Sequence, residues 1–339
     1  YVDCSINLKN KKEFLKEFSI KHKNKNELYT ILIKGNINAL SKAITLVEST
    51  LETDQEKSQE LISKCINKEY NSVRIGVTGI PGVGKSSFIE KFGEKFIKEN
   101  KKVAVLAIDP SSEKTRGSIL GDKSRMQSLS NNHNVFIRPS SNSGTLGGVS
   151  NKTKDSIILC ETAGFEIIII ETVGVGQSET LVSKLVDIML LLSITGAGDR
   201  LQGIKRGIIE LSHLIIITKD DGENRNRVKE TILDFKSTLA LNTNIDNQWI
   251  QKALSCSAQE NTGILEIHKN IDKYIRQSKS TNFFNIKREE QNIFWIHKIL
   301  REEIGNRKFN NLRENNLIVK IENKIIKNNI NIYKIIRDI

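Results

Sequence analysis

Residues 79–87, Gly79-Ile80-Pro81-Gly82-Val83-Gly84-Lys85-Ser86-Ser87, carry the spacing G-x-x-x-x-G-K-S. An apolar run at 73–78 precedes this stretch and a helical pattern follows it, so backbone N–H groups and a helix N-terminus can converge on an anion. In that setting the Lys85 ammonium reaches the β- and γ-phosphates of a nucleotide, and the Ser86 hydroxyl binds Mg²⁺. We therefore predict a nucleoside triphosphate site here, rather than a loop that merely turns.

A second stretch, Thr218-Lys219-Asp220-Asp221, has the form [N/T]-K-x-D and follows another apolar run. Guanine presents N1–H and a 2-amino group along one edge, and the Asp221 carboxylate can accept from both, whereas adenine lacks that pair of donors. The stretch therefore predicts selection of GTP over ATP, with Lys219 beside the base; a simple strand-end turn is the alternative. Ser257-Ala258-Gln259, after the last apolar run, are expected to supply backbone contacts to the base.

Acidic residues and a glycine end two further runs and predict the metal side of the site. Asp109 follows the run at 103–108, and Glu171 ends the run at 167–171. Carboxylates there can hold Mg²⁺ directly or through water, while the N–H of Gly174 can meet the γ-phosphate and change conformation when that phosphate leaves. Helix capping by the acidic residues is the alternative interpretation.

The elements that must position these residues are short apolar runs separated by polar helical stretches. The runs are continuous rather than alternating, as strands buried on both faces require, and lie at 73–78, 103–108, 135–138, 167–171, 188–192, 214–218 and 253–255. We predict an α/β fold with a doubly wound, mostly parallel sheet, in which ligands gather at the carboxyl ends of the strands.

Helical patterns flank the predicted sheet. An apolar stripe within 36–51 predicts a packing helix in a helical segment at 1–70, and helix-like sequence returns after 280. We therefore expect a helical segment at 1–70, a nucleotide-binding domain at 71–280 and a second helical segment at 281–339. The last part of the chain is low in complexity, so its structure is the least predictable.

Composition excludes several classes of function. The net charge is +12, but the basic residues are dispersed and aromatics make up only 6%, so no nucleic-acid platform is predicted. No apolar run approaches the roughly 18 residues that a membrane helix requires, so we expect a soluble protein.

The cysteines Cys4, Cys65, Cys160 and Cys256 form no C-x-x-C pair, which indicates neither zinc nor disulfides and favours a reducing compartment. The chain starts at Tyr1 without a signal-like segment, and targeting cannot be judged from it.

Together these stretches resemble the MeaB/ArgK family of P-loop GTPases, which includes the mitochondrial protein associated with methylmalonyl-CoA mutase. The resemblance extends from about Glu27 to about Arg307. The matching stretches are 43–49, the phosphate loop, 108–112, 117–123, 137–140, 144–149, 171–179 and 196–199.

The resemblance implies a GTP- and GDP-binding chaperone that assists an adenosylcobalamin-dependent acyl-CoA mutase, gating cofactor loading and protecting the enzyme from inactivation. It places Ser86, Asp109, Asp122 and Glu171 around Mg²⁺. It makes 174–179 and 196–207 switches, with Lys205 as the catalytic switch lysine. It also implies a homodimer formed mostly by the carboxyl-terminal helices, in the cytoplasm of a bacterium or in the mitochondrial matrix of a eukaryote.

Hydrolysis in such a site is mostly electrostatic positioning of the phosphates and an attacking water, with Lys85 among the catalytic residues. No residue is an obvious base. Gln177 lies beyond Gly174 rather than adjacent to it and is a candidate for positioning the water, and Lys205 can complete the site when a partner orders its loop. We therefore expect slow intrinsic hydrolysis that the mutase accelerates.

Two other functions stay open at this point. One is a phosphate-loop kinase or ATPase associated with basic amino acid transport, against which Asp221 argues. The other is a GTPase that delivers nickel or cobalt; such a protein normally has a His-rich or Cys-rich tract, but the five histidines here are scattered.

Three positions depart from the family pattern. Arg200 stands where the family usually has an acidic residue, which could alter coupling to the partner. Thr218 replaces the commoner asparagine and loses an amide that braces the base loop, but should preserve the choice of guanine. The stretch at 114–116 is more basic than usual for the first switch region.

Overall fold

The computed structural model describes residues 25–66, 71–109, 126–141, 151–172, 178–196, 206–240, 249–328 and 332–338. Seven strands form one sheet in the order β3-β2-β4-β1-β5-β6-β7, and every pairing is parallel. The strands are β1 (Val73–Gly79), β2 (Val103–Asp109), β3 (Val135–Ser141), β4 (Ile167–Thr172), β5 (Ile188–Ser193), β6 (Leu214–Ile217) and β7 (Lys252–Ser255). The predicted α/β fold with a doubly wound sheet is confirmed.

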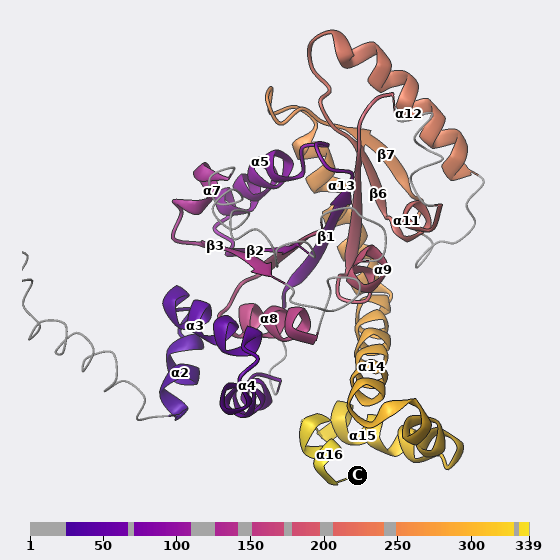
Figure 1. The fold of residues 1–339 in the computed structure, drawn as a ribbon. Helices are drawn as coiled ribbons and strands as arrows, with labels where there is room; N and C mark the ends of the chain where they lie inside the picture. Colours follow the sequence, from indigo (N-terminus) through magenta and orange to yellow (C-terminus); the bar gives the residue numbers. More distant parts are fainter. Residues whose placement is uncertain are drawn as a thin grey trace, which may run out of the picture.

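Helices cover both faces of the sheet, which explains why its central strands are mostly apolar (Figure 1). In β4, Ile169 packs with α5 (Lys85–Lys98) and α13 (Ile264–Ser280), while its neighbours Ile168 and Ile170 pack with helices on the opposite face. Successive strand residues point to opposite faces, so a strand covered on both sides needs an unbroken apolar run.

Helix α5, which begins at the phosphate loop, is fixed to the sheet by a stripe of phenylalanines. Phe88, Phe92 and Phe96 are buried at helical spacing, and their neighbouring ring centroids are 5.2 and 4.9 Å apart. The short α7 (Gln127–Ser130) packs against the same helix. The beginning of α5 is therefore held at the end of β1.

The opposite face is covered by α2 (Lys25–Leu32), α3 (Ile37–Glu48), α4 (Glu52–Cys65) and α8 (Asn151–Thr162). The helix predicted within 36–51 is α3, and its apolar stripe of Ala39, Leu40, Ala43, Ile44 and Val47 is buried as expected. The side-chain oxygen of Asn36 accepts a hydrogen bond of 2.9 Å from the N–H of Ala39, which caps the helix at its start.

Around β5 to β7 lie α9 (Ser178–Ser183), α11 (Arg206–Leu211), the 3-10 turn η2 (Gly222–Asn224) and α12 (Arg225–Ala240). Beyond α13, the long α14 (Phe283–Glu314) extends away from the sheet and carries α15 (Leu317–Asn328) and α16 (Ile332–Asp338) at its far end (Figure 1). We call α15, α16 and the distal end of α14 the C-terminal arm. The arm has its own apolar cluster, which includes Leu300, Phe309 and Ile321. No helix among the described residues has the length and apolar character needed to cross a bilayer.

Buried ion pairs attach α14 to the amino ends of the strands. The Arg288 guanidinium donates to both Asp187 carboxylate oxygens, each at 2.8 Å, and the backbone N–H of Arg74 donates to the same carboxylate at 2.8 Å. The Arg74 guanidinium pairs with Glu161 at 2.8 and 2.9 Å. Burial opposes ionisation of Asp187, but Arg288 and Arg74 together hold the pKa of its carboxyl below the usual range.

Replacing Asp187 with asparagine is expected to lower the free energy of unfolding by about 3 kcal/mol, because it removes the closest carboxylate of the buried Arg288 cation and leaves Glu161, at 3.9 Å, as the remaining acidic neighbour. The folded-state pKa is lower than the unfolded value of about 3.9, so the carboxylate stabilises the fold fully above that value and loses its effect as the pH falls. Urea denaturation from neutral to acidic pH measures both effects, and Glu60→Gln, in a partly exposed pair with Lys64, is the control. A loss no larger than that of the control would contradict the prediction.

Candidate nucleotide site

The phosphate loop joins the end of β1 to the start of α5. Gly79 has φ of 149°, and a Cβ atom there would lie 2.5 Å from the carbonyl oxygen of Leu192 on the neighbouring β5. Gly84, just before α5, has φ of 95°, a conformation that L side chains rarely adopt. The glycines therefore let the chain pass close to β5 and then turn so that α5 begins with its N–H groups facing outward at this edge.

Lys85 is buried within the loop that it follows. Its side chain is 9% exposed, and Nζ donates to the carbonyl oxygens of Gly79 at 2.8 Å and Ile80 at 3.3 Å. Burial lowers the pKa of the ammonium group, while the nearby carboxylates of Glu171 and Glu179 act in the opposite direction. The lysine is thus placed beside the loop with acidic groups around it, ready to exchange loop carbonyls for phosphate oxygens.

Two of the predicted magnesium ligands come together at the same edge. The Ser86 hydroxyl donates to Oε1 of Glu171 at 3.5 Å, and the register of β1 with β4 sets Val77 opposite Glu171. A hydroxyl and a buried carboxylate are the hard oxygen donors that Mg²⁺ prefers, so these residues fit the ion. Asp109 is the last residue of β2, at the same edge of the sheet. Its side chain, together with Asp122, Gly174, Gln177 and Lys205, lies outside the part of the chain that the structure describes.

The base side lies at the carboxyl ends of β6 and β7. Asp221 Oδ2 accepts a hydrogen bond of 2.5 Å from the hydroxyl of the fully buried Ser257. Lys219, with φ of 60°, turns the chain between Thr218 and Asp221. Ala258 and Gln259 follow Ser257, and Gln259 is exposed. The two stretches predicted to recognise the base therefore lie side by side, although they are far apart in sequence.

A hydrogen bond that the sequence analysis missed joins the base loop, residues 218–221, to the phosphate loop. The Thr218 hydroxyl donates to the Val83 carbonyl at 2.6 Å and lies 3.2 Å from the carbonyl of Ser193. Thr218 lacks the amide of the usual asparagine, and we expected the base loop to lose a brace for that reason. The hydrogen bond from the Thr218 hydroxyl to Val83 offsets this loss. Thr172 similarly donates to Thr78 at 2.9 Å, tying the ends of β4 and β1 together. The signal available in the sequence was a threonine at the end of each strand.

Replacing Thr218 with valine is expected to weaken GTP binding by about tenfold. Valine keeps the shape but leaves the buried Val83 carbonyl without its donor, a loss of about 1–3 kcal/mol. Calorimetric titration with GTP measures the change, and Thr231→Val on α12, whose hydroxyl bonds only within its own helix, is the matched control. Equal affinities of the two variants would show that the bridge between the loops contributes nothing to binding.

The thiol of Cys256, beside the base loop, is unreactive near neutral pH. Burial, with a smaller effect from Asp220, raises the pKa of the Cys256 thiol to about 12. Cys65, Cys160 and Cys256 are each buried, and none of these three is joined in a disulfide. The Cys256 thiol therefore stays protonated near neutral pH.

Comparison with known proteins places this geometry in context. Residues 40–313 match the family described as "Methylmalonyl Co-A mutase-associated GTPase MeaB", and this range contains both the phosphate loop and the base loop. The chain is 44% identical over 281 residues to GTPase ArgK of Escherichia coli (strain K12), covering 83% of this chain and 85% of that protein. It is 41% identical over 287 residues to the mitochondrial methylmalonic aciduria type A homolog of Mus musculus, covering 82% and 69%.

A solved structure is similar over nearly the whole chain. The crystal structure of a LAO/AO transport system kinase superposes with a TM-score of 0.72 at 33% sequence identity, covering 94% of this chain and 98% of that one. The similarity therefore includes the helices at both ends of the sheet domain as well as the sheet itself.

Proposed function

Because this chain belongs to the MeaB family of methylmalonyl-CoA mutase-associated GTPases, we propose that it is a chaperone of an adenosylcobalamin-dependent acyl-CoA mutase. The protein is a GTPase that binds GTP and GDP, and the resemblance noted in its sequence is confirmed. In the proposed role it gates loading of the cobalamin cofactor and protects the mutase from inactivation. The name of the family, which associates it with methylmalonyl-CoA mutase, supports the mutase as the partner.

The observation that carries the nucleotide assignment is the meeting of two loops at one edge of the sheet. The phosphate loop leaves β1, the base loop leaves β6, and Thr218 bonds directly to Val83 between them. An anion cradle and a carboxylate that reads guanine are thereby held in a fixed relation. A guanine nucleotide spans the two, with its phosphates on α5 and its base against Asp221.

The proposed mechanism follows from the charges at this edge. Backbone N–H groups at the start of α5 and the Lys85 ammonium stabilise charge on the β- and γ-phosphates. Ser86 and Glu171, with Asp109 and Asp122, would hold Mg²⁺, which supplies further charge neutralisation when bound. In this mechanism Gln177 orients the attacking water, the N–H of Gly174 meets the γ-phosphate, and Lys205 completes the site when a partner orders its loop.

We also propose an arrangement of domains and a site of action for the GTPase. We place the nucleotide-binding domain at 71–280, between a helical segment at 1–70 and a dimer-forming segment at 281–339. The arm of α14, α15 and α16 projects from the sheet and offers surface for a second copy (Figure 1). The protein would act in the cytoplasm of a bacterium or, like the relatives named as mitochondrial, in the mitochondrial matrix of a eukaryote.

Two measurements test this function. Titration should show tight GTP binding with little binding of ATP, because adenine does not offer the pair of N–H donors that the Asp221 carboxylate accepts from guanine. Steady-state GTP hydrolysis should be slow and should rise when purified adenosylcobalamin-dependent methylmalonyl-CoA mutase is added. Rapid hydrolysis that ignores the mutase would remove the chaperone role, and a preference for ATP would favour the kinase alternative.

A further inference from the structure

The backbone of the base loop is strained at Lys219. Its φ of 60° lies in the left-handed region, which residues other than glycine rarely adopt. Such a conformation persists only where the surrounding structure holds it in place. The contacts that hold Lys219 therefore decide how the base loop presents its side chains.

The peptide group between Lys219 and Asp220 is hydrogen-bonded at both of its polar ends. Its carbonyl oxygen, on Lys219, accepts a hydrogen bond of 2.7 Å from Nδ2 of Asn224. Its N–H, on Asp220, donates to the carbonyl oxygen of Cys256 at 3.1 Å. A planar peptide group that is held at both ends can rotate only by losing one of these bonds, so the direction in which the chain continues to Asp221 is set.

The Asn224 side chain is itself held in one orientation. The hydroxyl of Thr195, two residues beyond the end of β5, donates to Asn224 Oδ1 at 2.6 Å. Since a backbone carbonyl can only accept, the amide nitrogen must face Lys219 and the amide oxygen must face Thr195. The backbone N–H of Asn224 donates to the carbonyl oxygen of Asp221 at 3.1 Å, which closes the turn η2. Thr195 therefore fixes which end of the amide meets the base loop.

Asn224 supplies the base loop with an amide that position 218 does not provide. The side chain of Thr218 is a hydroxyl, and its hydrogen bond goes to Val83 of the phosphate loop. The Asn224 amide comes from the turn that follows the base loop and bonds to the loop backbone at Lys219. The two contacts are complementary, because Thr218 joins the base loop to the phosphate loop and Asn224 sets the path of the backbone between Lys219 and Asp221.

We propose that Asn224 is a positioning residue for guanine recognition, because its amide holds the peptide group that aims the Lys219 and Asp221 side chains at the base. The inference rests on the proposed assignment of the base loop and adds a residue that acts through the backbone, with no need to touch the nucleotide. Without this donor, Lys219 would relax toward a right-handed conformation. The Asp221 carboxylate would then turn away from the paired donors of guanine.

Asn224→Asp tests the donor without changing the size of the side chain. The carboxylate can still accept from Thr195 but repels the carbonyl oxygen of Lys219, so the affinities for GTP and for GDP should each fall by about tenfold. KM for GTP should rise while kcat stays almost unchanged, since the base is bound equally in the ground state and the transition state. Calorimetric titration and steady-state hydrolysis measure these effects. A lower kcat with an unchanged KM would contradict the proposal.

Inosine triphosphate distinguishes positioning of the base loop from a general loss of stability. Hypoxanthine keeps N1–H but lacks the 2-amino group, so a correctly aimed Asp221 carboxylate binds guanine more tightly. In Asn224→Asp, the ratio of GTP affinity to inosine triphosphate affinity should fall by about threefold or more. A variant that is merely less stable has fewer active molecules but keeps this ratio.

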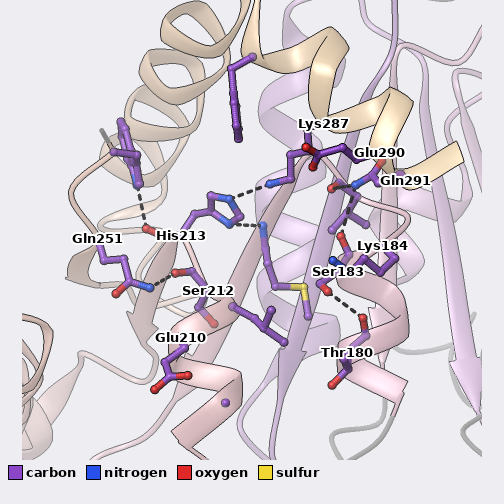
Figure 2. A pocket seen from close by; sticks show the side chains of 16 residues that line it. Thr180, Ser183, Lys184, Glu210, Ser212, His213, Gln251, Lys287, Glu290 and Gln291 are labelled. Carbon is purple, nitrogen blue, oxygen red and sulfur yellow. Dashed lines mark hydrogen bonds between the residues drawn. The ribbon is translucent and has the colours of Figure 1, made fainter. Parts of the chain in front are cut away.

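The matched control changes an amide of the same kind at the other end of the strands. Gln251 immediately precedes β7 and lines a cavity of about 670 Å³ at the amino ends of β5 and β6. Its Nε2 donates to the carbonyl oxygens of Ile209, at 3.0 Å, and Ser212 (Figure 2). Gln251→Glu exchanges an amide for a carboxylate as Asn224→Asp does. It should leave the ratio of GTP affinity to inosine triphosphate affinity unchanged, whatever its effect on thermal unfolding.

Thr195 provides a second set of variants in case Asn224→Asp does not fold. Thr195→Val removes the hydroxyl that orients the amide and should lower the same affinity ratio, whereas Thr195→Ser should restore it. In an Asn224→Ala background, Thr195→Val should have no further effect on the ratio, because Thr195 acts only through the amide.

Two negative results have different meanings. An unaltered protein that does not prefer GTP over ATP would overturn the proposed base site itself. If the unaltered protein prefers GTP, an unchanged ratio of GTP affinity to inosine triphosphate affinity in every folded variant of Asn224 and Thr195 would overturn only this inference.

Discussion

Asp221→Asn is expected to lower the affinity for GTP by about 100-fold to 1,000-fold and to create affinity for xanthosine triphosphate. A carboxylate accepts from both N1–H and the 2-amino group of guanine, whereas the asparagine amide turns one acceptor into a donor. Hydrogen bonds to charged groups contribute about 1.5–3 kcal/mol each, and a tenfold change in affinity corresponds to 1.4 kcal/mol. Xanthine has a carbonyl oxygen in place of the 2-amino group, so it accepts from the new N–H.

The neighbouring residue provides a matched control for this exchange of specificity. Asp220 has the same side chain one position earlier, but its carboxylate accepts from the Ser255 hydroxyl at 2.6 Å. Asp220→Asn should therefore leave the ratio of GTP to xanthosine triphosphate affinity unchanged. Competition titrations with both nucleotides measure the ratio. If Asp221→Asn kept its preference for GTP, the base would have to be recognised elsewhere.

The strands were predictable because their burial on both faces leaves a continuous apolar pattern. Each predicted run became a strand, and the differences are at the ends: β3 continues to Ser141, and β6 stops at Ile217. Strand ends depend on where neighbouring backbones stop pairing, and β6 pairs with β5 and β7 only as far as Ile217. Pro139 lies inside β3, which is tolerated because β3 is the edge strand of the sheet.

The approach of Ser86 to Glu171, and of Asp221 to Ser257, could be expected from a general rule. Both pairs follow parallel strands, and the carboxyl ends of such strands meet at one edge. The hydrogen bond from Thr218 to Val83 could not be expected from this rule, because it depends on how closely the base loop approaches the phosphate loop.

The C-terminal arm shows a second limit of sequence patterns. A low-complexity end rich in Asn, Ile and Lys gave little guidance, yet α15 and α16 form and share an apolar cluster with α14. Gly305, with φ of 78° and ψ of 158°, interrupts the helical geometry of α14 and lets the chain fold back on itself. Isoleucines at helical spacing supply the buried face, so the bias in composition does not prevent packing.

Lys85→Ala is expected to reduce kcat/KM for GTP by about 10²-fold to 10³-fold or more, the range seen when one preorganised donor to developing charge is removed. The ammonium is the buried cation of the phosphate loop, with Glu171 and Glu179 nearby, and its loss leaves the phosphates with backbone donors and the metal alone. Single-turnover hydrolysis measures the chemical step, and thermal unfolding shows whether the variant remains folded.

Two further variants separate charge from geometry in this prediction. Lys85→Arg keeps the positive charge, but a planar guanidinium cannot take the place of a compact ammonium that donates to Gly79 and Ile80 in a buried position, so activity should stay low. Lys91→Ala, in the same helix but paired with Glu94 at the surface, should hydrolyse GTP at the normal rate. If Lys85→Arg were as active as the unaltered protein, charge alone would suffice, and the close fit of Lys85 to the loop would have no part in hydrolysis.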